Sequence, residues 1–559
     1  MKKLITLPVV LMFIFLTFKI QAQEFNWAKR AGMWGVDLGY GVCVDAMGNI
    51  YVTGKYEMNA RFDDITVDIM GNHDIFNAKY GPDGKIIWVR TAGGLYGDYG
   101  HAIVCDAEGN TYLTGEMDGD IIFDGSDIKL SGWGRNDIFI AKYNTEGVAL
   151  WAQRGGGAMS DKGDGIAISK DAVYATGYFR DVASFGNNGA YKVASKGEKE
   201  AYLVKYDLMG NLLWLKRGGG IGDDEGNDIT VDAEGYIYLT GYFTDEADFD
   251  GVMVKSNGGR DAYLAKYAPS GDLIYVKNVG GSRGAMGNSI KAGKDGRVYM
   301  TGGFSGSADF GSTKLKSNGA RDVFVACFTN EGEIVWANNA GGEIDDEGLG
   351  LALDDSSNVY ITGYYGNSAD FGAEVVTGVD SSEIFIAKYD SNGEFKWVMK
   401  ADGQNDGKVA RDLNEAGRAI CVDPKNYVIV TGSFITDAVF GPFALNQWSN
   451  TNIFTAKIKQ DESDDTPYVT NILKNNSDNY FKIYPIPSDK EINISYSGEE
   501  LSNVKIRLES MEGKTLLEKQ FRSFSSGNQI LQLNDIAKGI YILQISTEQE
   551  HFFQKIIIK

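Results

Sequence analysis

The sequence predicts an all-β protein: a seven-bladed β-propeller of four-stranded blades, followed by a small C-terminal β-sandwich. Two observations predict the propeller. An aromatic anchor recurs every 61 to 63 residues, at Trp27, Trp88, Trp151, Trp214, Tyr275, Trp336 and Trp397. A Thr-Gly pair accompanies it and begins at Thr53, Thr114, Thr176, Thr240, Thr301, Thr362 and Thr431. A fixed period of this length indicates a repeat architecture.

Each repeat contains four short β-rich runs. In the second repeat these are residues 101–105, 111–114, 137–143 and 148–152, with a long polar excursion between the second and third runs. Gly, Asp and Asn bound the runs, which is the pattern of antiparallel hairpins. Four antiparallel strands repeated around an axis make a propeller blade.

The ends of the repeat region predict how the ring closes. The first repeat is preceded by a lone anchor strand at 25–30, and the last repeat ends at 454–458 without one. We expect the N-terminal strand to supply the fourth strand of the last blade, which gives seven blades and leaves no open edge. The alternative is an open solenoid of the same units.

The first 22 residues are typical of a secretory signal peptide. Lys2 and Lys3 precede an apolar stretch at 4–18, and small residues at 20–22 offer a cleavage site before Gln23. The alternative, a retained membrane helix, requires a longer apolar run. No later segment is long and apolar enough, so no transmembrane segment is predicted after cleavage.

Net charge restricts the partners. The formal net charge is -22, and the last 79 residues are balanced, so the acidic excess lies in the repeats and the following linker. Nucleic acid and anionic membranes are therefore poor partners, because phosphate binding needs a basic surface.

The four cysteines allow two interpretations. Cys43 and Cys421 occupy the same register in repeats that become neighbours if the ring closes. They could form a disulfide, or they could be buried free thiols that act as small apolar residues.

The turn after the first strand of each repeat carries the most specific motif. Its clearest copy is Asp45-Ala46-Met47-Gly48-Asn49-Ile50-Tyr51-Val52-Thr53-Gly54. It resembles the bacterial β-propeller repeat family called SBBP, and the resemblance extends over all seven repeats. That resemblance implies a fold and says little about activity.

A polar linker at 461–480 separates the propeller, 23–460, from a C-terminal module at 481–559. Short alternating strands such as 492–496 and 504–508 predict a β-sandwich there. Ordered motif residues run through this module: Tyr484, Pro485, Pro487, Gly513, Lys514, Gly539, Tyr541 and Lys555.

This module resembles the type A sorting domain of the type IX secretion system. The resemblance implies export through a dedicated translocon of a Gram-negative bacterium, with the protein then released or attached to the outer-membrane cell surface. The alternative is a plain adhesive sandwich.

We expect any binding site on the face that carries the long excursions and the loops between blades. Acidic residues cluster in those loops, and six are metal candidates: Asp223, Asp224, Glu225, Asp345, Asp346 and Glu347. Clustered carboxylates suit Ca²⁺, which prefers six to eight oxygen ligands. The alternative is an acidic, solvated rim.

Five aromatic residues of the same loops are candidates for ligand binding: Trp34, Tyr96, Tyr99, Trp133 and Trp448. An exposed aromatic ring beside hydrogen-bonding acids is a plausible platform for a sugar. The alternative is that these rings pack down their own loops.

No catalytic motif is found. The three histidines, His73, His101 and His551, form no known metal or catalytic pattern, and no cofactor is indicated. The sequence therefore predicts a non-catalytic binding protein outside the cell, with a glycan or a protein as ligand. A secreted polysaccharide hydrolase and a structural surface spacer are the alternatives.

Overall fold

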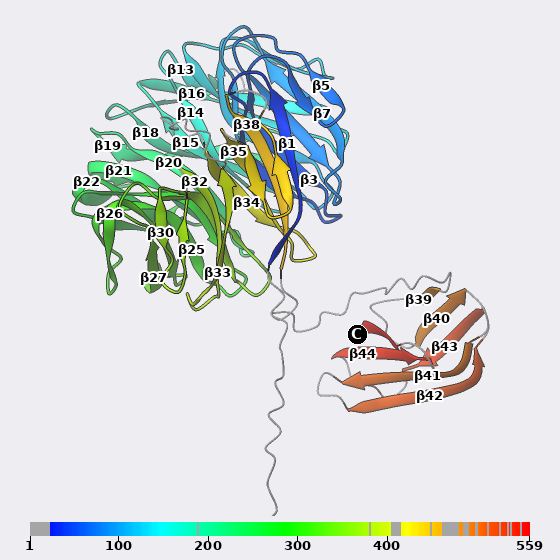
Figure 1. Cartoon of the computed structure of the whole chain (residues 1–559). Helices are drawn as coiled ribbons and strands as arrows, with labels where there is room; N and C mark the ends of the chain where they lie inside the picture. Colours follow the sequence, from blue (N-terminus) through cyan, green and yellow to red (C-terminus); the bar gives the residue numbers. More distant parts are fainter. Residues whose placement is uncertain are drawn as a thin grey trace, which may run out of the picture. The chain divides into compact units, whose positions relative to one another are not determined.

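The structure is a computed structural model, shown in Figure 1. It describes residues 23–186, 189–378, 382–403, 415–435, 437–447, 450–460, 480–484, 491–497, 501–510, 514–524, 527–533, 536, 539–547 and 551–558. Every regular element in these ranges is a β-strand, so the protein is all-β as predicted. No helix long and apolar enough to span a membrane occurs in them. The predicted signal peptide lies outside the described residues.

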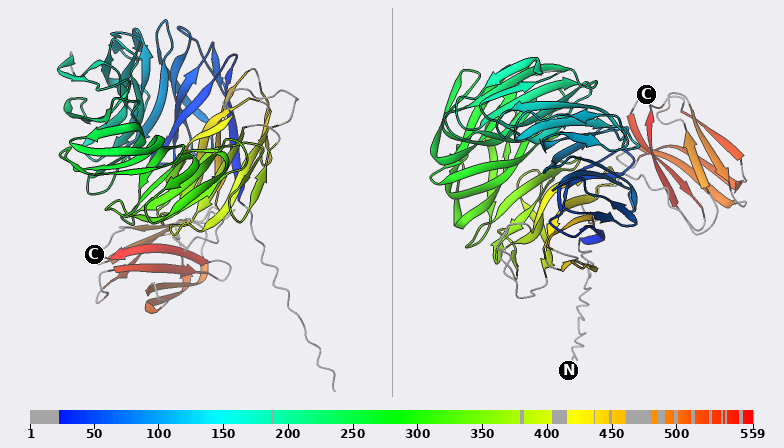
Figure 2. Two further views of the ribbon diagram at one scale, coloured as in Figure 1. Left: turned by 90° about the vertical axis from the view of Figure 1, so that its left-hand side faces the viewer. Right: turned by 90° about the horizontal axis from the view of Figure 1, so that it is seen from above.

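The chain divides into two compact units, Met1–Gln460 and Asp461–Lys559. In the first unit the repeats follow one another as antiparallel sheets in sequence order, from blue to yellow in Figure 2. The first three four-stranded groups are β2 (Leu38–Val44), β3 (Ile50–Tyr56), β6 (Asp74–Tyr80) and β7 (Ile86–Gly93); β8 (Tyr99–Cys105), β9 (Thr111–Asp118), β12 (Asn136–Tyr143) and β13 (Ala149–Gly157); and β14 (Lys162–Ile168), β15 (Ala172–Phe179), β18 (Glu200–Asp207) and β19 (Leu212–Gly220).

The following groups have the same order. They are β20 (Glu225–Val231), β21 (Ile237–Phe249), β22 (Val252–Tyr267) and β23 (Leu273–Gly281); β24 (Gly284–Ala292), β25 (Val298–Asp309), β26 (Lys314–Phe328) and β27 (Ile334–Ala340); β28 (Glu347–Leu353), β29 (Val359–Tyr365), β32 (Glu383–Tyr389) and β33 (Phe395–Gly403); and β34 (Ala416–Val422), β35 (Val428–Phe434), β38 (Asn452–Lys459) and β1 (Glu24–Met33). In the last group, β1 pairs antiparallel with β38 (Figure 1).

The polar excursions form short hairpins, and most of these pair with the fourth strand of the preceding repeat, whereas the β30–β31 hairpin makes only an isolated bridge from Asp370 to Gly341. Thus Ile122 of β10 pairs with Gly93 of β7, and Phe62 of β4 pairs with Ala31 of β1. The separate hairpin strands are β4 (Ala60–Phe62), β5 (Ile65–Val67), β10 (Ile121–Phe123), β11 (Lys129–Leu130), β16 (Val182–Phe185), β17 (Tyr191–Ala194), β30 (Ser368–Asp370), β31 (Val375–Thr377), β36 (Ala438–Phe440) and β37 (Phe443–Leu445). In the fourth and fifth repeats the hairpin is a continuation of the second and third strands, which joins three repeats into one sheet.

The anchor residues connect neighbouring repeats. The indole N–H of Trp88 donates to the carbonyl of Thr145, 3.1 Å away in the next repeat's turn, and its ring packs on Gly147 of that turn. Gly147 has φ +79°, and a Cβ there would lie 3.1 Å from the ring. Tyr275 replaces Trp but makes the same type of bond, since its hydroxyl donates to the carbonyl of Asn330 at 3.3 Å.

The Thr-Gly pairs mark a second contact between repeats. The hydroxyl of Thr301 donates to the carbonyl of Phe324 at 2.7 Å, within its own repeat. A Cβ on Gly348 of the next repeat would lie 2.4 Å from that hydroxyl, so only Gly fits. The same contact occurs at each repeat and also joins Thr431 of the last repeat to Gly39 of the first.

The core lies between successive sheets. One buried cluster combines Trp27 and Ile453 of the last sheet with Val52 and Phe76 of the first. The four cysteines are free thiols, so Cys43 and Cys421 do not form a disulfide.

The second unit contains two sheets. One has the order β39 (Tyr480–Tyr484), β40 (Glu491–Ser497), β43 (Gly527–Gln532), and the other β42 (Thr515–Phe524), β41 (Leu501–Ser510), β44 (Gly539–Ser546), β45 (His551–Ile558). Buried side chains of both sheets, including Ile494, Leu531, Ile506 and Leu543, form one core.

Candidate functional site

The acidic residues of the loops between repeats are mostly structural. Asp346 is fully buried, and its two carboxyl oxygens accept hydrogen bonds from the backbone N–H groups of Gly342 (2.7 Å) and Gly366 (2.9 Å). Asp224 has the same position and accepts from Gly220 and Thr244. Burial raises the pKa of each of these two carboxyl groups to about 7. Each of these carboxyl groups therefore connects the loop between two repeats with the excursion that follows it.

The neighbouring candidates are also engaged. Glu225 pairs with Lys199 at 2.9 Å and accepts from the Tyr242 hydroxyl at 2.8 Å. Glu347 makes equivalent contacts with Arg321 and Tyr364.

The remaining two metal candidates do not complete a site. Asp223 lies 3.9 Å from Arg260, and Asp345 is exposed. Among the described residues, no three His, Cys, Asp or Glu side chains are grouped so that they could hold a metal ion. The calcium hypothesis therefore has no ligand set in this part of the chain.

Three of the aromatic candidates are exposed at loop tips. Trp34 is 60% exposed, Tyr96 53% and Trp133 45%. Trp34 stands three residues before Asp37, a buried carboxylate equivalent to Asp346, which accepts from the backbone N–H of Met33 at 2.9 Å. The loop is thus held from inside while its tip faces solvent. Trp448 lies outside the described residues.

Trp133 is the least free of the three. The guanidinium of Arg154 lies 3.0 Å from its ring centroid, and a Cβ on Gly189 would lie 2.8 Å from the ring edge. Its backbone N–H donates to the buried Asp137 at 2.6 Å. One side of the ring therefore packs on its own surroundings, and the rest of it is available to a ligand.

Other loop tips of the same repeats carry exposed apolar side chains that the sequence analysis did not select: Met70, Leu95, Met159 and Ile221. We call these four, with Trp34, Tyr96 and Trp133, the apolar loop tips. Some equivalent positions in later repeats are polar, as at Asn257, Asn318 and Glu343, and the apolar Ile344 is partly buried. The apolar loop tips are therefore confined to the first repeats and the loops that flank them.

Tyr99 belongs to a different group from Tyr96. It begins β8, is half-buried, and its ring lies parallel to that of His101 with centroids 5.9 Å apart. His73 lies 5.3 Å from it on the other side. The ring of Tyr40 lies 5.1 Å from His101, so these rings form one continuous row.

Two members of that row, Tyr40 and His101, lie at a β-bulge that recurs in every repeat. The first strands of the repeats, β2, β8, β14, β20, β24, β28 and β34, each contact the next, and β34 contacts β2; we call them the inner strands. Each pairs with its second strand through a register shift at one residue. The residues at these shifts are Tyr40, His101, Asp164, Asn227, Asn288, Leu349 and Arg418. Sequence reasoning did not select these seven as one set of site residues, although a Gly precedes each at the repeat period.

Tyr40, His101 and Asp164 share one polar group with Glu116 and Lys162, which we call the inner-strand cluster. His101 Nε2 lies 3.4 Å from Glu116 Oε1, and Lys162 Nζ lies 2.6 Å from Asp164 Oδ1. Gly163, between Lys162 and Asp164, packs against the Thr114-Gly115 pair that precedes Glu116.

The two carboxyl groups of the cluster differ in acidity. Burial raises the pKa of Asp164 to about 7, although Lys162 opposes this shift. Burial also acts to raise the pKa of Glu116, but hydrogen bonds from His101 and Asn136 outweigh it and bring that pKa to about 2. Burial lowers the pKa of His101, so its imidazole is neutral at pH 7.

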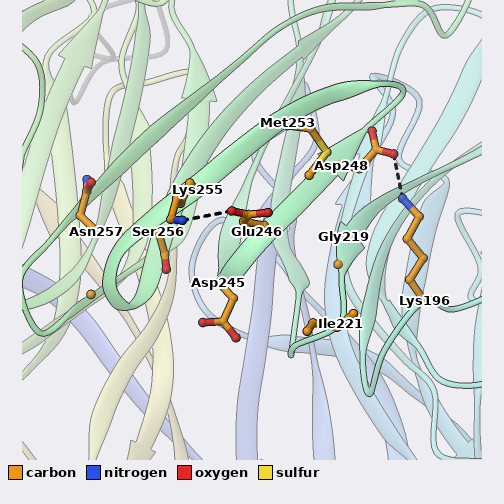
Figure 3. Close-up of a pocket in the computed structure, with 12 residues that line it drawn as sticks. Lys196, Gly219, Ile221, Asp245, Glu246, Asp248, Met253, Lys255, Ser256 and Asn257 are labelled. Carbon is orange, nitrogen blue, oxygen red and sulfur yellow. Dashed lines mark hydrogen bonds and ion pairs between the residues drawn. The ribbon is translucent and has the colours of Figure 1, made fainter.

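A separate pocket of about 660 Å³ lies between the end of β19 and the β21–β22 hairpin (Figure 3). Two ion pairs flank it, Lys196 with Asp248 at 2.8 Å and Lys255 with Glu246 at 3.1 Å. No candidate residue from the sequence lines it, and no buried polar side chain converges on it, so we do not assign it a ligand.

Comparison with known families identifies both parts of the chain. Residues 482–559 match the secretion system C-terminal sorting domain, and residues 213–250 match the β-propeller repeat called SBBP. Both resemblances are confirmed, and the chain is a secreted or cell-surface protein. Of the sorting residues, Tyr541 is buried on β44 and Lys514 is exposed, while Pro485, Pro487 and Gly513 lie outside the described residues.

The proteins that match this chain add little about its activity. An uncharacterized WD repeat-containing protein of Acanthamoeba polyphaga mimivirus is 22% identical over 73% of this chain and 36% of its own length. The regulatory protein FlaEY of Caulobacter vibrioides is 26% identical over 30% of this chain and 18% of its own. The chain thus spans about a third or less of these relatives. A copper-bound fungal alcohol oxidase matches 81% of this chain and 95% of its own at 10% identity, but its TM-score of 0.27 carries no argument.

Proposed function

We propose that this exported protein is a non-catalytic glycan-binding protein, which holds its ligand on the face that carries the apolar loop tips. The exposure of Trp34, Tyr96 and Trp133 on loops fixed by buried carboxylates is the observation that carries the proposal. Large aromatic surfaces that stay exposed in a secreted protein suit a ligand with apolar faces and many hydroxyl groups, such as a sugar.

We also propose that the repeats form a closed seven-bladed propeller. The contact between Thr431 and Gly39 supports closure, because it repeats between last and first repeat the contact made within the series. The pairing of β1 with β38 supports it independently. A closed ring supplies the rigid scaffold that mobile loops need in order to present a defined surface.

A glycan array probed with the exported chain tests the binding function. We expect binding that weakens by about tenfold or more in Trp34→Ala, because covering about 75 Å² of the ring contributes roughly 2 kcal/mol. Leu150→Ala is the matched control, since Leu150 is 51% exposed but lies on strand β13 rather than on a loop tip. If no glycan binds, glycan recognition is wrong and a protein ligand becomes the remaining form of the hypothesis.

Polysaccharide hydrolysis is a second candidate function. Two carboxyl groups of unequal pKa, Asp164 and Glu116, lie in the inner-strand cluster, and a glycosidase needs one protonated and one ionised carboxyl group. Release of reducing ends from a bound polysaccharide, abolished in Glu116→Gln, would replace the non-catalytic proposal. If the protein binds the polysaccharide but releases no reducing ends, the non-catalytic proposal is supported.

A further inference from the structure

The inner-strand cluster combines side chains of three successive repeats. Tyr40 comes from β2, His101 and Glu116 from β8 and β9, and Lys162 and Asp164 from β14. The backbone frame beneath them is the same at every repeat, because each bulge residue follows a Gly that packs on the neighbouring Thr. The side chains on this frame nevertheless differ, and elsewhere they include the apolar Leu349. The frame therefore does not require these polar residues.

The cluster is withdrawn from solvent although it is polar. The side chains of His101, Glu116 and Asp164 are only 12%, 14% and 12% exposed. Burying charged groups costs free energy unless they find partners. Asp164 Oδ1 bonds Lys162, but its Oδ2 is shielded from solvent and has no hydrogen-bond partner among the described residues. This oxygen is an acceptor that no described donor satisfies, and a ligand donor reaches it only when the surrounding side chains move aside.

Charge and hydrogen-bonding capacity indicate the class of ligand. Glu116 and Glu225 carry negative charge against Lys162 and Lys199, His101 is neutral, and burial opposes ionisation of Asp164, so the cluster with its neighbours is nearly balanced. A balanced cluster does not select phosphate or a polycation. It mixes acceptors, donors and a hydroxyl, and a ligand hydroxyl can both donate and accept.

The cluster lies close to an exposed loop tip. Tyr96 is three residues before Tyr99, a backbone distance of at most about 10 Å, and the ring of Tyr99 lies parallel to that of His101. Tyr99 therefore connects the Tyr96 loop tip with the His101 side of the cluster.

We propose that the inner-strand cluster binds one neutral sugar residue of the glycan held by the apolar loop tips, with a sugar hydroxyl donating to Asp164 Oδ2. This inference rests on the proposed function and adds the position and chemistry of a second contact. Lys162 and His101 serve as donors to other hydroxyls, and Tyr40 offers a ring face beside them.

The test is isothermal titration calorimetry, which measures the affinity of the full exported chain for neutral, uronate-containing and sulfated oligosaccharides. Asp164→Asn should weaken binding of a neutral oligosaccharide roughly tenfold to hundredfold, because it replaces a charged acceptor. Leu349→Ala, at the same bulge in another repeat, should leave the affinity unchanged within about twofold. Tyr40→Phe, which removes one hydroxyl and keeps the ring, provides a milder variant if Asp164→Asn lowers the Tm.

The outcomes separate this inference from the proposed function. If the wild type binds a neutral glycan with an affinity that Trp34→Ala lowers but Asp164→Asn and Tyr40→Phe leave unchanged, the inner-strand cluster is not a sugar site and the loop-tip function stands. Binding only to sulfated oligosaccharides overturns the proposed ligand class. Failure of the wild type to bind any oligosaccharide contradicts both proposals.

Discussion

The buried carboxylates that fasten the loops give a stability prediction with a definite sign. Asp346 is fully buried and accepts two backbone hydrogen bonds. In Asp346→Asn the amide offers one oxygen, so one of those N–H groups loses its acceptor. That loss destabilises the fold by about 1–3 kcal/mol at any pH.

The stability of the wild type also falls as the pH rises, because of Asp346, and this fall offsets the difference between the two proteins. Burial raises the pKa of Asp346 from 3.8 to about 7, so the folded chain keeps a proton that the unfolded chain releases. The stability from this group is fully present below about pH 4 and is lost as the pH rises through 7. The difference in pKa corresponds to about 4 kcal/mol. Asn does not titrate, so the variant escapes this loss.

We therefore expect Asp346→Asn to be clearly less stable than wild type at pH 4.5 and equally or more stable at pH 8. Urea denaturation of both proteins at the two pH values measures the difference, and titration of the other carboxylates cancels. Asp127→Asn is the control, because Asp127 is exposed and lies in another repeat. A difference that does not change with pH refutes the raised pKa. A variant that becomes relatively worse at high pH shows that the two N–H groups stabilise the charged form.

Three further predictions concern contacts between repeats. Tyr275→Phe should lose about 1 kcal/mol through its bond to Asn330, whereas Tyr275→Trp should retain stability in thermal melts, since Trp makes this bond elsewhere. Gly348→Ala should lower the Tm by several degrees, because its Cβ would lie 2.4 Å from the Thr301 hydroxyl. The pair Glu24→Cys and Lys459→Cys should form a disulfide visible on a non-reducing gel, since these residues are paired in β1 and β38; a chain that stays reduced under oxidant would contradict that pairing.

The strand order of the repeats could be predicted because both periodic signals report backbone contacts that recur at every repeat. Trp88 needs the next repeat's turn, and Thr301 needs a Gly in the next repeat, so each contact leaves a residue at a fixed spacing. The pairing of the excursion hairpins with the preceding repeat does not require any residue type at a fixed spacing, so the sequence did not indicate it. Backbone ladder bonds do not require particular side chains, so the sequence pattern places Ile121–Phe123 only within a polar excursion, although it forms β10.

The site was harder to predict for a different reason. Asp224 and Asp346 look like solvated loop acids in the sequence, because a carboxylate that accepts backbone N–H bonds uses the same residue type as one that binds a cation. Tyr96 and Tyr99 are near neighbours in sequence, yet a strand begins between them and separates an exposed ring from an inner one. The exposure of Trp34, Tyr96 and Trp133 is what their places in loops suggest.

The pairing of β1 with β38 sets the order in which the first unit can be completed. Glu24 and Lys459 are the ends of that pairing, so the last sheet lacks its fourth strand until the whole repeat region has been made. Joining ends so far apart in sequence costs roughly 5 kcal/mol in chain entropy, and folding with such distant contacts is slow. Until then β1 lacks β38 as its partner, and its unpaired edge is a template for association with other chains. A newly made chain is therefore most vulnerable to aggregation just before its final repeat is finished.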